Sequence, residues 1–304
     1  MSAELEKRVL RKITLRIVPF VMLLYFIAFI DRVNIGFAAL TMNKDLGFSP
    51  TVFGFGAGIF FLGYFLFEVP SNLVLDKVGA RIWIARVMIT WGLISGAMAF
   101  VQGPNSFYAL RFLLGAAEAG FFPGIILYLS YWFPLQQRAA VTAIFMAAAP
   151  LSTVLGSPVS GALLEMHGLL GLSGWQWMFI VEAVPALILG VVVLFYMTDR
   201  PEKAKWLSDD ERNWLAATMN AESAKKAGTA SHSVWRGLDR PARHSIVAGL
   251  FRDLGRPLHA RHLGTANHQG IWPFVIASRF PQCAAGYRRH RRDGAVGATF
   301  GSQR

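Results

Sequence analysis

The stretch IVPFVMLLYFIAFIDRVNIGFAAL, residues Ile17–Leu40, decides the fold class. It is longer than the roughly 20 residues that a helix needs to cross a bilayer, and no charged side chain precedes Asp31 within it. A cleavable signal peptide does not fit, because its apolar core is about 7–15 residues long and ends at a small-residue site, whereas Asp31 and Arg32 follow here. We therefore expect a membrane-spanning helix that stays in the protein.

Further stretches of similar length and apolarity follow within the first 200 residues. Their approximate bounds are Val52–Leu75, Trp83–Val101, Phe107–Phe133, Ala139–Leu164 and Trp177–Met197. The composition agrees, since 54% of the residues are hydrophobic and 16% are charged, against about a quarter charged in soluble domains. The sequence thus predicts an all-α membrane protein with six transmembrane helices.

The expected organisation has four parts. These are a cytoplasmic N-terminal segment (1–16), a six-span bundle (17–198), a cytoplasmic loop (199–235) and an irregular basic tail (236–304). The net charge of +12 is unevenly distributed, because residues 201–304 hold 17 Lys and Arg against 8 Asp and Glu, and residues 1–200 hold 13 against 10. The tail carries no recognised nucleic-acid motif, so no nucleic acid is expected as a partner.

The connections between spans indicate the orientation, because Lys and Arg accumulate in cytoplasmic loops. The side that holds both ends of the six-span unit is basic: its residues include Lys7, Arg8, Arg11, Lys12, Arg16, Lys77, Arg81, Arg86, Arg138, Arg200, Lys203 and Lys205. The connections on the other side offer only Lys44, next to Asp45. Both ends of the six-span unit are therefore expected in the cytoplasm, as in a multi-pass protein of a bacterial inner membrane.

Four charged residues fall inside spans, where an ionised side chain costs at least about 2.5–3.5 kcal/mol. Asp31 and Arg32 lie in the first span, and Arg111 and Glu118 lie in the fourth, two helical turns apart on one face. One interpretation is a polar cavity in which the arginines bind an anion and the carboxylates carry protons. The other is two structural ion pairs. We favour the first, because buried pairs are weak stabilisers.

Other intramembrane features are less specific. Glu68 and Glu182 are lone acids in the second and sixth spans. Small residues crowd the second and fourth spans and should let their helices approach closely: Gly54, Gly56, Gly58, Gly63, Gly115, Ala116, Ala117, Ala119, Gly120 and Gly124. Neither a nucleophile–base pair nor a His-rich metal spacing occurs in the spans, and Cys283 is the single cysteine. No catalytic residue, metal or cofactor is expected, so the chain is not predicted to be an enzyme.

The sequence NLVLDKVGAR at 72–81 links the second and third spans. We expect a basic loop in which Gly79 permits a tight turn while Asp76, Lys77 and Arg81 contact helix ends. Together with RFLLGAAEAG at 111–120 and LGSPVSG at 155–161, this loop resembles the signature set of the major facilitator superfamily. The segments DRVNIG (31–36), YWFP (131–134) with Arg138, and DRPEKAKWL (199–207) resemble its anion:cation symporter family.

That resemblance implies one half of a major facilitator fold and a secondary transporter of a small organic anion, such as a carboxylate or sugar acid, moved together with protons by alternating access. By the same resemblance, Arg32 and Arg111 match carboxylate-binding arginines, and Asp31 and Glu118 match proton-coupling acids. Asp76, Lys77, Gly79 and Arg81 match the gating loop. The partners implied are the lipid bilayer, the anion and protons. The alternative is a six-helix membrane scaffold or regulatory module that transports nothing.

The family is built from two six-span halves, and only the first is visible in this sequence. After Trp235 no apolar stretch reaches 18 residues and Lys is absent, and six of the seven His occur after Ser231. Codons can be chosen for Asp239–Val275 so that the next reading frame encodes an apolar segment resembling the seventh span of the family. We therefore expect a frameshift, and with it a truncated protein that is inactive because it lacks the second half.

Overall fold

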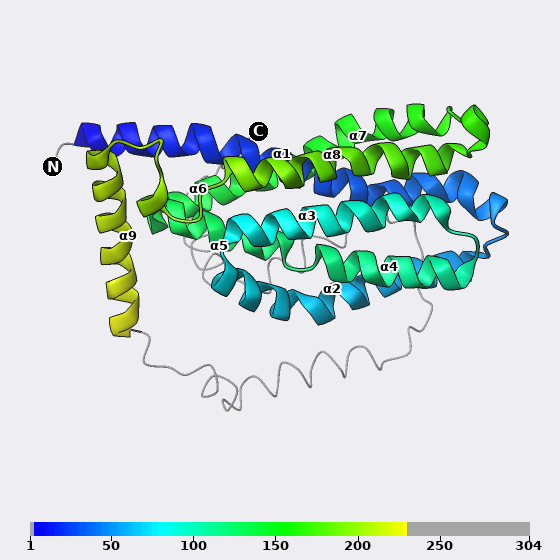
Figure 1. The fold of residues 1–304 in the computed structure, drawn as a ribbon, viewed down its shortest axis with the longest axis horizontal. Helices are drawn as coiled ribbons and strands as arrows, with labels where there is room; N and C mark the ends of the chain where they lie inside the picture. Colours follow the sequence, from blue (N-terminus) through cyan, green and yellow to red (C-terminus); the bar gives the residue numbers. More distant parts are fainter. Residues whose placement is uncertain (1–2, 230–304) are drawn as a thin grey trace, which may run out of the picture. The chain divides into compact units, whose positions relative to one another are not determined.

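The computed structural model describes residues 3–229, which are helical with no strand in that range (Figure 1). The nine α-helices of this range are α1 (Ala3–Asp45), α2 (Pro50–Val78), α3 (Ala80–Ala97), α4 (Pro104–Glu118), α5 (Phe121–Trp132), α6 (Leu135–Met146), α7 (Ala148–Leu164), α8 (Gly174–Tyr196) and α9 (Asp209–Thr229). Short 3-10 turns follow α3, α7 and α8, at Met98–Phe100, Leu169–Gly171 and Pro201–Lys203. The expected frameshift and tail (236–304) lie outside the described residues.

Six segments of this range are long and apolar enough to cross a membrane, which confirms the predicted spans. They are α1, α2, α3 with its following turn, α4 with α5, α6 with α7, and α8. The first helix is longer than its span, because the N-terminal segment before Ile17 continues as helix from Ala3. A single helix thus extends from the membrane to the basic residues of the N-terminus.

Two of the spans are broken into two helices. Between α4 and α5, Gly120 has a φ of 83°, and a Cβ there would overlap the side chain of Ser71 on α2. Only glycine tolerates this conformation and contact easily. Between α6 and α7 the change of direction falls at Ala147. The break at Gly120 lies just after Glu118, so the end of α4 places this acid in the middle of the bundle.

Small residues bring α2 and α4 together, as expected. A Cβ on Gly115 would overlap the carbonyl oxygen of Phe60, and a Cβ on Gly63 would overlap that of Phe112. These two glycines therefore set the separation of the helices. The expectation does not extend to Gly54 and Gly58, where an added Cβ would meet no atom of the described residues within 4 Å.

The connection between α2 and α3 is shorter than the predicted loop. Asp76 and Lys77 belong to the last turn of α2, Arg81 belongs to the first turn of α3, and Gly79 alone separates the helices. Gly79 has a φ of 99°, and its N–H donates to the carbonyl oxygen of Leu75 at 2.9 Å. The predicted loop was wrong in its extent, because one glycine in this conformation is enough to reverse the chain.

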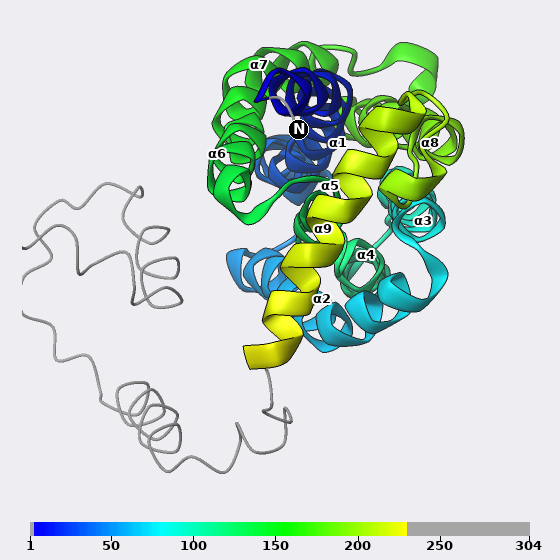
Figure 2. The same cartoon turned by 90° about the vertical axis from the view of Figure 1, so that its left-hand side faces the viewer.

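The last described helix, α9, crosses one end of the bundle instead of running along it (Figures 1 and 2). It contacts the N-terminal part of α1 and the end of α5. The turn at Gly79 and the α5–α6 junction lie at this same end, where Gly79 approaches Asp199 and Leu135 bonds to Glu222 of α9. The basic residues that predicted the orientation therefore gather at one end of the bundle.

Candidate functional site

The charges of α1 and α4 meet inside the bundle. The guanidinium of Arg32 donates to the carboxylate of Glu118 and forms an ion pair with it. The side chain of Glu118 is 3% exposed and that of Arg32 is 22% exposed. Arg32 also lies over the ring of Tyr64, 5.3 Å from its centroid, and its buried Nε has no hydrogen-bond partner in residues 3–229. One of the two pairs considered from the sequence therefore exists, and its arginine has an unused donor.

Asp31 does not pair with Arg111. Its carboxylate instead accepts hydrogen bonds from two side chains of α3, Trp91 Nε1 at 2.7 Å and Ser95 Oγ. It also accepts one from Asn34 Nδ2 on α1, at 3.2 Å. The side chain is buried. Neutral donors thus hold this acid, with no cation of residues 3–229 within 4 Å of it. A carboxyl group in such a setting can exist with or without its proton.

Arg111 is the unusual member of the set. It is 4% exposed, its Nε donates to the carbonyl oxygen of Gly56 at 3.3 Å, and its guanidinium lies 4.6 Å from the centroid of the Phe60 ring. No carboxylate within the described range comes within 4 Å of it. Burying a charge is costly unless it is paired, and this arginine has the nearby charges of Asp31 and Glu118 but no direct carboxylate partner. Such a group is suited to bind an anion.

Neither of the two lone acids forms an ion pair within residues 3–229, although Glu182 lies near Asn34 and Asp31. Glu182 on α8 is buried and accepts a hydrogen bond from Ser160 Oγ at 2.6 Å, while its Oε2 has no hydrogen-bond partner within residues 3–229. Glu68 on α2 is half-buried. Within the same range, no group of three or more His, Cys, Asp or Glu side chains could hold a metal ion.

The four gating-loop residues lie together at the α9 end of the bundle. Asp76 accepts a hydrogen bond from the hydroxyl of Tyr131 at 2.9 Å. The backbone N–H of Arg81 donates to Asp199 at 2.8 Å, and its guanidinium lies 4.0 Å from the same carboxylate. Lys77 and Gly79 line a polar pocket of about 210 Å³ between these contacts. The segment thus links the α2–α3 turn to the residues after α8.

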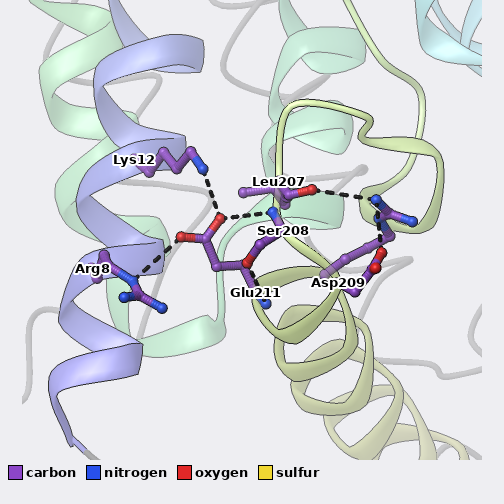
Figure 3. Close-up of polar contacts among 7 residues, drawn as sticks. Arg8, Lys12, Leu207, Ser208, Asp209 and Glu211 are labelled. Carbon is purple, nitrogen blue, oxygen red and sulfur yellow. Dashed lines mark hydrogen bonds and ion pairs between the residues drawn. The ribbon is translucent and has the colours of Figure 1, made fainter.

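A second set of ionic contacts holds α9 against α1 (Figure 3). Lys12 Nζ donates to Glu211 at 2.7 Å, Arg8 lies 3.4 Å from the same carboxylate, and the N–H of Ser208 donates to it at 3.0 Å. The hydrogen bond from Lys12 is the main cause that lowers the pKa of Glu211 from its ordinary value. A matching contact joins Arg138 of α6 to Glu222 at 2.8 Å.

The partners of the buried charges were missed from the sequence. Trp91 and Ser95 are one turn apart in the third span, so they place a tryptophan N–H and a hydroxyl on one face of an apolar helix. This pair of donors was the signal in the sequence that could have indicated a partner for Asp31. Ser160 lies within the segment LGSPVSG, but nothing in the sequence pairs it with Glu182. The bond between Arg111 and the carbonyl of Gly56 depends on the close approach of α2 and α4.

Comparison with known proteins places the fold and these motifs in one family. The family model described as Major Facilitator Superfamily matches residues 21–280. The chain belongs to this superfamily. The matched range extends past Trp235, where the resemblance was expected to end. Family membership and the names of the relatives indicate a transporter rather than an enzyme.

Two bacterial relatives illustrate the similarity. The chain is 82% identical over 238 residues to a protein of Agrobacterium vitis named "Putative tartrate transporter", a match that covers 78% of this chain and 55% of that protein. It is 49% identical over 246 residues to a protein of Pseudomonas putida named "Putative metabolite transport protein NicT", a match that covers 81% of this chain and 53% of that protein. The chain therefore spans about half the length of the curated relatives it matches.

Solved structures agree on the fold. The xylose transporter XylE from E. coli, in a partially occluded inward-open conformation, has a TM-score of 0.57 at 15% identity and covers 78% of this chain and 62% of that one. A bacterial homolog of the human lysosomal transporter Spinster has a TM-score of 0.57 at 20% identity, covering 61% and 44%. The described helices thus form one six-span half of a major facilitator fold.

Proposed function

We propose that this chain supplies the first half of a secondary transporter that moves a small organic anion, a carboxylate or sugar acid, together with protons by alternating access. The observation that carries the proposal is Arg111, a buried guanidinium with no carboxylate within 4 Å in residues 3–229. The name of the Agrobacterium vitis relative supports a hydroxylated dicarboxylate such as tartrate as the substrate class.

In this proposal Arg111 is the primary site for the substrate carboxylate. A guanidinium can donate two parallel hydrogen bonds to one carboxylate, which adds geometric selectivity to the charge attraction. The contacts to Gly56 and the Phe60 ring fix the group on α4 before substrate arrives. Arg32 lies on the neighbouring helix and offers a second guanidinium, so a substrate with two carboxylates could engage both.

Proton coupling follows from the pair between Arg32 and Glu118. While Glu118 is ionised, it occupies the guanidinium of Arg32. Protonation of Glu118 removes that attraction and frees Arg32 for the substrate, so proton binding and anion binding favour each other. Asp31 is the second acid, and its donors Trp91 and Ser95 on α3 would change with any movement of α1 against α3.

The remaining features fit an alternating-access cycle. The Asp76–Tyr131 and Arg81–Asp199 contacts are proposed to latch the end of the bundle that carries the basic residues, which we place in the cytoplasm of a bacterial cell. A second six-span half would form the other wall of the pathway, because the substrate site in such folds lies between two repeats. The cytoplasmic assignments of 1–16 and 199–235 are part of this proposal.

Binding measurements test the role of Arg111. The chain is co-expressed with the second half of its Agrobacterium vitis relative, and binding of tartrate to the purified assembly is measured by isothermal titration calorimetry. Arg111→Ala should abolish binding, and Arg111→Lys should weaken it because the planar fork is lost. Arg11→Gln, at an exposed position of α1, removes the same charge and should bind as the unchanged protein does.

Two outcomes would count against the proposal. If Arg111→Ala binds tartrate normally, the buried guanidinium is not the substrate site. If neither tartrate nor other small carboxylates bind to an assembly that is folded and intact, the alternative of a membrane scaffold without transport is favoured.

A further inference from the structure

A groove of about 380 Å³ lies between α2 and α3, with residues of α4 lining its base. We call it the α2–α3 groove. Its apolar lining consists of Phe67, Pro70, Val74, Phe112, Leu113 and Ala116. Figure 2 shows α4 between the other two helices. The side chains of Phe67 and Leu113 are 46% and 49% exposed, so the groove is open to the surroundings of the bundle.

This groove is separate from the buried charges of the proposed transport site. Leu113 lies two residues after Arg111, which at about 100° per residue turns it to the opposite side of α4. Arg111 and Glu118 face α1 and α2 in the interior, where they contact Gly56 and Arg32. Leu113 instead lies on the outside of the described helices, where its side chain is 49% exposed.

One charged side chain lines the groove. Arg86 of α3 is half-buried, and its guanidinium lies 3.9 Å from the centroid of the Trp83 ring. The indole N–H of Trp83 donates to Ser71 Oγ at 2.9 Å, which fixes this ring against α2. No carboxylate of residues 3–229 lies within 4 Å of Arg86. The α2–α3 groove therefore combines an apolar lining with an arginine that has no carboxylate partner within residues 3–229.

Arg86 lies near the end of α3 that carries the α2–α3 turn. It lies six residues after Ala80, the first residue of α3, which corresponds to about 9 Å of helix. An arginine at this depth needs an anion or a route to water, and its stem can lie along apolar surface while its guanidinium reaches the interface. A free anion would satisfy the charge but would leave the apolar channel unfilled.

We propose that the α2–α3 groove binds an anionic phospholipid of the leaflet at which α3 begins. The phosphate accepts hydrogen bonds from the guanidinium of Arg86, and one acyl chain lies along the apolar lining. Charge complementarity selects the headgroup, because basic pockets between transmembrane helices attract anionic lipids and a guanidinium can bind phosphate through two hydrogen bonds. The lipid would cover a face of α2 and α3 that no other described helix covers.

Trp83 provides a reporter for the test. The purified chain is reconstituted into phosphatidylcholine vesicles that contain the same small fraction of either brominated phosphatidylglycerol or brominated phosphatidylcholine, and quenching of tryptophan fluorescence is measured. Brominated phosphatidylglycerol should quench more strongly, with a relative affinity about fivefold higher, which corresponds to one basic residue near the surface. Trp83→Phe should remove the additional quenching.

The matched variants separate charge from general attraction to the membrane. Arg86→Gln should abolish the preference for phosphatidylglycerol, whereas Arg11→Gln, which removes an exposed charge of α1, should keep it. Val74→Phe fills the groove while retaining Arg86 and adds no tryptophan, and it should also reduce quenching of Trp83. The proposal is wrong if both brominated lipids quench the unchanged chain equally, or if Arg86→Gln and Val74→Phe both retain the full preference.

Discussion

Charged residues of this chain occupy two contrasting settings. Inside the bundle, Asp31, Arg111 and Glu118 are at most 4% exposed, and only one ion pair joins the charges of α1 and α4. At the α9 end, the cations Arg8 and Lys12 are 65% and 43% exposed, although the side chain of their partner Glu211 is 5% exposed. Exposed pairs contribute at most about 1 kcal/mol, whereas a buried charge that loses its partner is strongly destabilising. The ionic contacts between α9 and α1, which we call the rim, can therefore change with little loss of stability. Each buried charge, in contrast, requires a partner or a functional role.

Breaking the interior pair should have the largest effect. Glu118→Leu leaves the partly buried Arg32 without its carboxylate and should lower the free energy of unfolding by up to about 3–5 kcal/mol. The double variant Arg32→Met/Glu118→Leu removes both charges and should recover most of that loss. Chemical denaturation in detergent micelles measures both. Equal stability of the single and double variants would show that the pair is not desolvated as described.

The packing that positions α4 gives the next largest effect. Gly115→Ala places a Cβ against the carbonyl of Phe60, so α2 and α4 must separate, at a cost of about 1–3 kcal/mol. Gly58→Ala, on a face of α2 with open space, should change the stability by less than about 0.5 kcal/mol. The same unfolding experiment compares them. A similar cost for both would mean that helix separation is not set by Gly115.

Changes to the contacts between α9 and α1 should affect stability weakly, and their effect should depend on pH. Because the pKa of Glu211 is lower in the folded protein, its pairing with Lys12 stabilises above the ordinary glutamate pKa of 4.5 and is lost as the pH falls through the lowered value. Glu211→Gln should cost less than about 1 kcal/mol at neutral pH.

Hydrogen exchange of the α9 amides measures how much the Glu211 contacts stabilise this helix. In the unchanged chain, protection of the α9 amides, corrected for the intrinsic exchange rate, should fall as the pH drops below the ordinary glutamate pKa of 4.5. Glu211→Gln should remove this pH dependence of protection. A variant that keeps the same pH dependence would show that the effect does not come from Glu211.

The sequence predicted the architecture more fully than the site. Six apolar stretches gave the six spans, because in a bilayer each span must be a long apolar helix whatever surrounds it. The extent of the α2–α3 loop was wrong, since hydropathy falls at Asp76 and Lys77 although the helix continues to Val78. Exposed charged residues end an apolar stretch without ending a helix.

The partners of the buried charged residues could not be predicted from the sequence as well as the spans could. The sequence placed Arg111 and Glu118 in one span, and both lie on α4, but it did not show that Glu118 pairs with Arg32 and that Arg111 has no carboxylate within 4 Å. That choice depends on the register of α1 against α4 and on the break at Gly120, which are properties of tertiary packing. Asp31 likewise turns to α3 because Trp91 and Ser95 present donors there.

The buried charges are proposed to serve transport instead of stability, and gradient-driven uptake tests this most directly. Proteoliposomes containing the chain assembled with the second half of its Agrobacterium vitis relative are supplied with labelled tartrate, with and without an inward proton gradient. Glu118→Gln should lose accumulation driven by the gradient while retaining part of the tartrate exchange, and Arg111→Ala should lose both. If both variants accumulate tartrate as the unchanged assembly does, the interior charges are structural and the proposed mechanism is wrong.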